Sequence, residues 1–459
     1  MQSDQRLTTQ YKAAPPVTDC TASHRLSHTL KRRHIDINFA GGDVSTLGGV
    51  ELLRLADRRL GLSDSIARAL PDPRNPALIT HKWDALLRQR LFAIGAGLAD
   101  LNDHNQLRLD AALQTAVGSL DTLASPATLC RLEATASRSA AAACHRILLD
   151  QFIASFDQPP ESLILDFDGT DDRVHGEQQG RAFNSHYGGY GFFPLYVYCG
   201  EHLLVSYLRP LDRPDAYHSA AVLKLLVTEL RRHWPAVRIV MRADTGFYRP
   251  LLLAWCERHA VEYLVGYASN KVLKRCVEVQ KRTLAEAWAY CEERDETLDK
   301  LKLFEDLSYR AGSWKRPRRV IAKLEHNALG SNERFVVTSL EGDAEQLYSE
   351  VYCERGTMEN RHKELQMGLF ADRTSCTAWW SNQLRVLLSS FAYVLLHHIR
   401  EKGLAGTHLA RAQVWTLRQR LIWIGGVILR NTRRIELRLS SACLEKAAFL
   451  TALQRLEGT

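Results

Sequence analysis

The sequence predicts an α/β protein whose mixed core is interrupted by a β-rich insertion and flanked by helical regions. Apolar residues recur with helical periodicity from Ser45 to Phe156, whereas short apolar runs with strand character alternate with helices over residues 157–267. Strand patterns dominate residues 268–340, and helical periodicity resumes at Leu347. A chain of 459 residues, of which 46% are hydrophobic, is long enough for two or three domains with sizeable cores.

The N-terminal part divides into an arm and a helical region. Residues 1–38 are polar and carry a basic cluster at Lys31, Arg32 and Arg33, which predicts a flexible basic arm. Residues 39–156 are expected to be α-helical, since turn signals such as Pro71-Asp72-Pro73 separate their periodic segments.

Residues 157–267 and 341–400 are expected to form the core. Its predicted strands cover residues 162–168, 193–198, 202–208, 237–243 and 261–265, and its helices cover residues 217–233 and 251–259. Three sequential strands followed by helix, strand, helix and strand is the order of a ribonuclease-H-like fold. The insertion, residues 268–340, has strand patterns at 301–309, 318–324 and 334–340, and residues 401–459 are expected to form a basic helical C-terminal region.

Two aspartates, Asp168 and Asp244, each follow an apolar strand and precede loop residues. A carboxylate at the end of a buried strand faces a crevice, where it is held rigidly and still reaches water. Either aspartate alone could instead be an ordinary helix N-cap. Asp166, two residues earlier on the same strand face, is a rival for the first position, and we prefer Asp168 because it lies at the mouth of the strand.

A third acid, Glu359, lies on a predicted helix over residues 352–367. At about 100° per residue this helix places its polar residues within one face roughly 80° wide; they are Tyr352, Arg355, Glu359, Lys363 and Gln366. Such a face is either a solvated surface with an Arg355–Glu359 ion pair or a carboxylate that joins the two aspartates, with cations beside it for phosphates.

The chemistry that suits three carboxylates is hydrolysis or transesterification of a phosphodiester. Two divalent ions about 3.5–4 Å apart can activate the attacking oxygen and stabilise the leaving oxygen. Carboxylates on two strands and a helix can hold such a pair, and hard oxygen ligands favour Mg²⁺ or Mn²⁺.

Several motifs around these acids resemble the DDE transposases of bacterial insertion sequences, most of all the insertion-sequence 1380 family. The segments that carry the resemblance run from about residue 40 to residue 400; they are Gly97–His104, Leu107–Asp110, Leu165–Asp172, His175-Gly176, Phe183–Tyr187, Leu208–Pro210, Arg242–Phe247, Tyr309–Trp314, Arg318–Lys323, Arg334–Thr338, and Tyr352, Arg355 and Glu359 as a Tyr-Arg-Glu signature.

The resemblance implies that Asp168, Asp244 and Glu359 are the catalytic triad and bind two Mg²⁺ or Mn²⁺ ions on a ribonuclease-H-like core. It also implies DNA contacts by Tyr352 and Arg355 in the signature. In related transposases a lysine often lies seven residues after the glutamate, where this sequence has Gln366. Lys363 is expected to take over its phosphate contact.

Related enzymes with a β insertion cut DNA through hairpin ends, and an aromatic residue there can stack on a flipped base. Trp314, with Arg318 and Arg319 nearby, is the candidate for this DNA contact. The alternative is that Trp314 belongs to the core of the small sheet.

The C-terminal region from Arg411 to Arg438 carries seven arginines against one acid, Glu436, and its apolar residues are interleaved with them. This pattern predicts amphipathic helices with a cationic face that contacts the phosphate backbone, unless the face is merely solvated. The whole chain has a formal charge of +8, which is a modest indication of a polyanionic partner. Its ten cysteines include no C-x-x-C pair, so neither a zinc ribbon nor a redox motif is indicated.

These patterns predict a DNA transposase that binds double-stranded DNA, both the terminal inverted repeats of its element and target DNA, as a homodimer on the DNA ends. Without a secretory signal or a membrane span, we expect a bacterial cytoplasmic, nucleoid-associated protein. The helical N-terminal region is the expected reader of the terminal repeats. The alternatives are a structure-specific metal-dependent nuclease on the same fold and a non-catalytic DNA-binding relative that has been domesticated.

Overall fold

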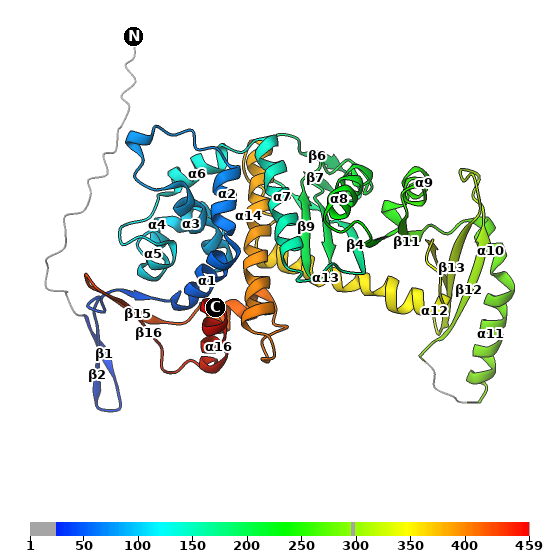
Figure 1. The fold of residues 1–459 in the computed structure, drawn as a ribbon. Helices are drawn as coiled ribbons and strands as arrows, with labels where there is room; N and C mark the ends of the chain where they lie inside the picture. Colours follow the sequence, from blue (N-terminus) through cyan, green and yellow to red (C-terminus); the bar gives the residue numbers. More distant parts are fainter. Residues whose placement is uncertain (1–23, 295–298, 459) are drawn as a thin grey trace, which may run out of the picture.

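The computed structural model describes residues 24–294 and 299–458, and its two halves meet at a long central helix, α14 (Trp379–His398) (Figure 1). The helices between residues 51 and 134 and the C-terminal segments lie on one side of α14, and α7 (Arg138–Ala154) and a long β-sheet lie on the other. No helix within the described residues is both long and apolar enough to span a membrane.

The N-terminal region is helical, as predicted. Gly61 separates the first two helices because its positive φ of 58° ends one and begins the next. Ser125 and Ser137 cap later helices by accepting hydrogen bonds from Thr128 N and Ala140 N. The helices are α1 (Glu51–Leu60), α2 (Leu62–Ala69), α3 (Trp83–Gly95), α4 (His104–Leu107), α5 (Ala111–Val117), α6 (Pro126–Ala134) and α7 (Arg138–Ala154), with 3-10 turns at Gly48–Val50, Pro76–Leu78 and Leu101–Asp103.

An eight-stranded mixed sheet forms the other half, in the order β12-β13-β14-β11-β10-β4-β8-β9. Strands β4, β10 and β11 are parallel, and the remaining neighbours in the sheet are antiparallel. The strands are β4 (Ser162–Gly169), β8 (Leu195–Cys199), β9 (His202–Tyr207), β10 (Arg238–Ala243), β11 (Val261–Tyr267), β12 (Leu301–Tyr309), β13 (Arg318–Asn327) and β14 (Gly330–Thr338). The predicted strands are therefore confirmed, with ends shifted by a few residues. Helices α8 (Ser219–His233) and α9 (Pro250–Arg258) confirm the two helices expected between them.

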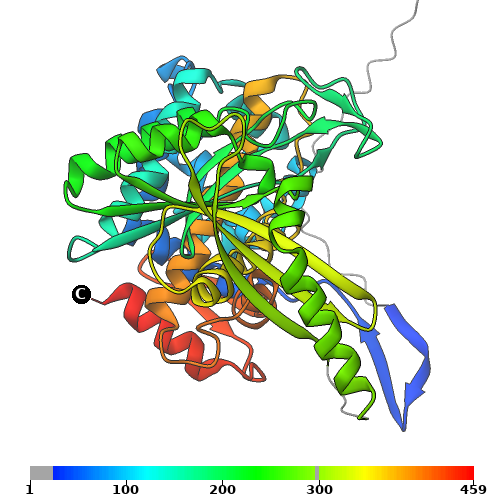
Figure 2. The same cartoon turned by 90° about the vertical axis from the view of Figure 1, so that its right-hand side faces the viewer.

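The insertion does not form a small sheet of its own, because β14 pairs with β11 and continues the core sheet. Its first part is helical rather than β-rich, in α10 (Lys271–Cys276) and α11 (Glu278–Glu292). The periodicity explains this correction: Leu284 and Trp288 are four residues apart and bury one helix face against β13. Figure 2 shows α11 lying along these strands.

Between β4 and β8 the chain forms a separate three-stranded sheet of short strands in the order β5-β7-β6. These strands are β5 (Asp172–Arg173), β6 (Ala182–Asn184) and β7 (Gly189–Phe192).

Two terminal predictions are wrong in part. Residues 1–23 of the expected flexible arm lie outside the described residues, whereas β1 (His24–Leu30) and β2 (Arg33–Ile37) form an antiparallel hairpin. Its two-residue turn contains Lys31 with a positive φ of 58°.

The basic C-terminal region is only partly helical. It contains a hairpin of β15 (Gly426–Arg430) and β16 (Ile435–Leu439), which β3 (Val44–Ser45) joins as a third strand. The alternation of exposed Val427, buried Ile428 and exposed Leu429 is the strand pattern that the charge count obscured. The region's helices are α15 (Val414–Leu417) and α16 (Lys446–Glu457), with π-helical turns at Ile399–Gly403 and Arg418–Ile422.

The two ends of the chain share one hydrophobic core. Helix α14 is buried along most of its length and packs against α3, α7 and β9, and α16 packs against α1. The N-terminal helices and the C-terminal segments are therefore parts of one folded unit.

Candidate active site

Asp168 and Asp244 lie side by side because their strands are parallel neighbours. Phe167 of β4 pairs with Ala243 of β10, so the next residue of each strand projects from the same edge of the sheet. Asp244 also caps a short 3-10 turn (Thr245–Phe247) by accepting a hydrogen bond from Gly246 N at 2.9 Å. The two carboxylates are thus neighbours at one edge of the sheet.

The third acid comes from a helix with irregular turns. Helix α13 (Thr357–Lys363) carries Glu359. The chain reaches it through α12 (Ala344–Gln346), a π-helical stretch (Leu347–Tyr352) and a 3-10 turn (Cys353–Gly356). A second π-helical stretch (Glu364–Gly368) follows α13. This segment brings the half-buried Arg355 to Asp168, with 3.6 Å between Arg355 Nη1 and Asp168 Oδ2.

The electrostatics tie the three acids to one site. Burial raises the pKa of Asp168 to about 6; Arg355 opposes the rise, whereas the charges of Asp244 and Glu359 add to it. Burial also raises the pKa of Asp244, again against Arg355. One arginine, Arg355, therefore offsets the charges of both aspartates, and Glu359 adds a further negative charge near Asp168.

This donor set fits a divalent cation that prefers oxygen ligands, such as Mg²⁺. The three carboxylates lie farther apart than the ligands of a bound ion. Within the described ranges, only one group of three metal-ligating side chains has all its ligand atoms within 4.8 Å of one another, and it consists of His202, His397 and Glu401. Glu359 is exposed on its helix, whereas Asp168 and Asp244 are fixed at the sheet.

Asp166, the rival for the first position, is engaged elsewhere. It is 1% exposed and forms a bidentate ion pair with Arg242, whose Nη2 lies 2.8 Å from Asp166 Oδ2. Arg242 Nη1 also donates to the carbonyl oxygen of Val351, on the segment that leads to Arg355 and Glu359. The pair therefore fastens that segment to β4 and β10.

Several residues at the site had no predicted role. The carboxylate of Asp215 lies against Gly246, where an added Cβ would come within 1.7 Å of it, and its charge helps to raise the pKa of Asp244. Buried Arg209 holds this loop by donating to the carbonyl oxygens of Asp215 and Tyr217. Arg209 belongs to a motif of the sequence resemblance, which was the available signal.

Two further side chains lie near the acids. Tyr187 shares the acidic environment, because Asp215, Asp171, Asp244 and Asp168 all add to the rise of its pKa that burial causes. His362 lies one turn after Glu359, with its Nδ1 4.0 Å from Asp168 Oδ2. Burial lowers the pKa of His362 to about 4, so its ring is neutral at neutral pH.

The remaining residues of the helix face divide between the site and solvent. Tyr352 reaches across β11, since a Cβ added to Gly266 would lie 2.8 Å from Tyr352 Oη and 2.7 Å from Thr245. Gln366 contacts the loop that follows Asp168, where it accepts a hydrogen bond from Thr170 Oγ1 and donates one to the carbonyl oxygen of Asp171, both at 3.3 Å. Lys363 is exposed and forms no ion pair within the described part of the chain.

The structure places Trp314 in the core, the alternative reading of this residue. It is 2% exposed, its indole N–H donates to Tyr248 Oη, and its ring packs against Tyr267 and Tyr309. Because Tyr248 follows the Asp244 turn, Trp314 supports the loop that carries this acid.

The two neighbouring arginines are also committed to protein contacts. Arg318 is buried and donates to both carboxylate oxygens of Glu257, at 2.7 and 3.2 Å. Arg319 pairs with Asp306 and donates to the carbonyl oxygens of Leu340 and Gly342. Both guanidinium groups are thus engaged by protein acceptors, and their contact with DNA stays a prediction.

The C-terminal arginines form a weaker cationic face than their number predicts. Buried Arg418 donates to Gly368 O at 2.7 Å, and Arg420 and Arg430 pair with Glu445 and Asp43. Those acids are distant in the sequence and could not enter a local charge count.

Carboxylates gathered at the edge of a mixed sheet, with an arginine between them, are typical of the class of enzymes that process phosphodiesters with divalent cations. Residues 27–459 match the profile of the family described as Transposase DDE domain group 1. The chain belongs to this transposase family.

Other comparisons add little to this assignment. Among solved structures, the chain is similar to the piggyBac transposase in its synaptic complex with hairpin DNA, at 12% identity and a TM-score of 0.38, over 81% of this chain and 79% of that one. A search of curated proteins gave no match.

Proposed function

We propose that this transposase cuts and joins DNA strands with Asp168, Asp244 and Glu359 as ligands of two Mg²⁺ or Mn²⁺ ions. The observation that carries the proposal is the position of these acids: two at adjacent parallel strand ends and the third on a helix fastened to the same strands. Bound ions would activate the attacking oxygen and neutralise the leaving one.

The core of the sheet supports a ribonuclease-H-like assignment. Strands β9, β8, β4, β10 and β11 lie in this spatial order. The first of these five along the chain, β4, is therefore central, and the fourth and fifth, β10 and β11, lie parallel to it on one side. On this proposal β12, β13 and β14 are the insertion, which widens the sheet beyond β11.

The chain's own residues would hold the substrate around the acids. Arg355 lies between Asp168 and the helix, where it can bind a phosphate oxygen as well as a carboxylate. Lys363, exposed one turn beyond Glu359, can contact the next phosphate along the strand. Burial around Asp168 and Asp244 excludes much of the solvent from the reacting groups.

The sequence resemblance extends the proposal to the reaction path. We propose a protein of the insertion-sequence 1380 group that binds its terminal inverted repeats with the helical N-terminal region, acts as a homodimer and passes through hairpin ends. A hairpin intermediate migrates differently from a nicked strand on a denaturing gel, which makes this step directly observable.

The test is a strand-transfer assay on a donor DNA that carries the cognate ends. Asp244→Ala is expected to abolish cleavage and joining while DNA binding persists, because the residue lies at the strand edge and not in a core. Asp150→Ala, an exposed aspartate on α7, is the matched control. Retained cleavage by Asp244→Ala would refute the site, and cleavage without joining by the wild type would favour a structure-specific nuclease.

A further inference from the structure

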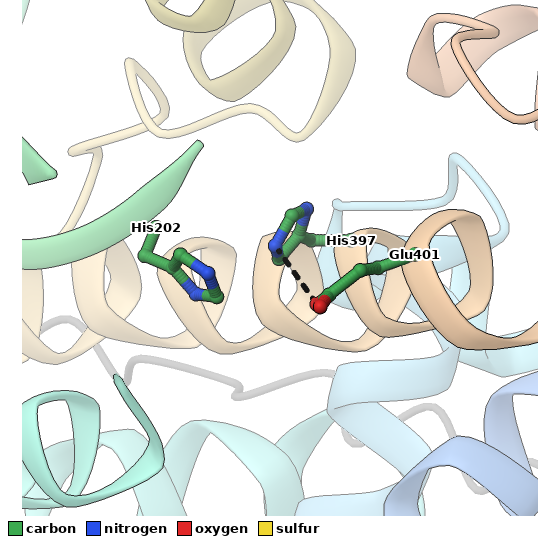
Figure 3. Close-up of side chains that lie close together, drawn as sticks. All are labelled: His202, His397 and Glu401. Atoms are coloured by element: carbon green, nitrogen blue, oxygen red, sulfur yellow. Dashed lines mark ion pairs between the residues drawn. The ribbon is translucent and has the colours of Figure 1, made fainter. Parts of the chain in front are cut away.

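A second group of metal-ligating side chains lies away from the acids, at the start of β9. His202 begins this strand, and His397 and Glu401 lie one turn apart on α14 and the π-helical turn after it (Figure 3). One ligand atom from each residue lies within 4.8 Å of the others. We infer that these three side chains bind a zinc ion that fastens β9 to α14.

The central ligand, His397, has no other use for its ring nitrogens. The residue is 8% exposed, and neither nitrogen has a hydrogen-bond partner among the described residues. Its nearest carboxylates are too distant for hydrogen bonds, at 3.6 Å from Nδ1 to Glu201 Oε2 and 3.5 Å from Nε2 to Glu401 Oε2. A buried imidazole with two idle nitrogens is costly unless a ligand completes it.

The two carboxylates flank His397 as the neighbours of a metal-binding histidine usually do. With Nε2 directed to the ion beside Glu401, Nδ1 can donate its proton to Glu201, which fixes the tautomer and the ring orientation. Glu201 is thus a positioning residue. Glu401 uses Oε1 for Lys402 Nζ at 2.8 Å, whereas Oε2 faces His397.

The space and the donor set fit zinc. The cluster lines a small cavity of about 40 Å³, enough for an ion and a water molecule. Ligand atoms around tetrahedral zinc lie roughly 3.4 Å apart, so modest side-chain rotations suffice. Two imidazoles with one carboxylate favour zinc over Mg²⁺, and a water molecule can complete the coordination.

The ion would act at a junction of the fold. The same cavity is lined by Leu60 of α1, Phe152 of α7 and Leu203 of β9, so it lies where the helical half meets the sheet. A zinc ion there would cross-link the two halves, and this inference is independent of the proposed function.

The experiment titrates the full chain, stripped with a chelator, with Zn²⁺ in excess Mg²⁺ by calorimetry, and records the visible spectrum of the Co²⁺ form. The decisive variants are His202→Gln and Glu401→Gln, since both side chains are less buried than His397. His408→Gln is the matched control, because this exposed histidine pairs with Glu445 outside the cluster.

We expect one Zn²⁺ per chain in the wild type, at least about 10-fold weaker binding in both decisive variants, and unchanged binding in the control. Zinc should also raise the melting temperature of the wild type but not of these variants. Wild-type affinity in both variants would overturn the inference. So would loss of the site in Asp244→Ala, because the ion would then lie at the acids.

Discussion

Replacing Asp168 with asparagine should stabilise the metal-free protein while abolishing cleavage. The side chain is 14% exposed, and its pKa rises from 3.8 to about 6 in the folded state. The stability from this raised pKa is fully present below pH 3.8 and is lost as the pH rises through 6, because the folded protein must then hold a poorly solvated charge. At about 1.4 kcal/mol per pH unit, the loss approaches about 3 kcal/mol at pH 8.

Asparagine has the same shape and no charge, so Asp168→Asn should recover most of that amount. Urea unfolding in a chelator should show a gain of up to about 3 kcal/mol at pH 8 and about half of it at pH 5. Added Mg²⁺ should narrow the difference in stability between the variant and the wild type. At a hundred times its dissociation constant, the ion stabilises the wild type by about 2.7 kcal/mol, whereas it has one ligand fewer in the variant.

Asp166→Asn is the matched control on the same strand. Its carboxylate neutralises buried Arg242, so removal of the charge should destabilise the protein by about 3–5 kcal/mol. If Asp168→Asn is no more stable than the wild type at pH 8 without metal, the reasoning about an under-neutralised site is refuted.

Three further perturbations test other parts of the structure. Trp314→Phe loses the hydrogen bond to Tyr248 and should lower the free energy of unfolding in urea by about 1–3 kcal/mol. Cleavage should fall only with the folded fraction, whereas selective loss of cleavage in a folded variant would support base stacking. Gly49→Ala should lower the free energy of unfolding by at least about 3 kcal/mol, because its methyl group would lie 1.6 Å from a backbone carbonyl oxygen. The control Gly425→Ala meets no atom within 4 Å and should change stability by less than about 0.5 kcal/mol, so equal urea midpoints for the two variants would contradict this reasoning. At limiting Mg²⁺, cleavage should decline about tenfold per pH unit below pH 6 as Asp168 takes up a proton, and a flat profile between pH 5 and 7 would exclude it as a metal ligand.

The strands of the core were predictable because their apolar runs are long and end in turn signals. The pairing of the strands was not predictable, since β14 joins β11 across 62 intervening residues, and no local pattern encodes that partner. The same limit explains the C-terminal region, where Glu445 and Asp43 neutralise arginines that the local sequence leaves unpaired. Period-two alternation at residues 426–430 was a local signal, but the dense arginines concealed it.

The site shows the same division between local and distant information. Family motifs marked the segments that hold Asp168, Asp244 and Glu359, and they also contained Tyr187 and Arg209 without indicating what these residues do. The choice between Asp166 and Asp168 depends on the register of β4 against β10, which sets Asp166 opposite Arg242. Only the paired strands supply that register.

The two aspartates of β4 therefore make opposite contributions to one site. Asp166 forms a buried ion pair with Arg242, and this arginine also fixes the segment that carries Arg355 and Glu359. Asp168, two residues along, is left with part of one arginine and two neighbouring acids, which favours the neutral form of its carboxyl. The charged form of Asp168 is therefore unfavourable at neutral pH unless a cation binds beside it. Residues of this kind are typical of functional sites, where a protein retains a group that lowers its stability.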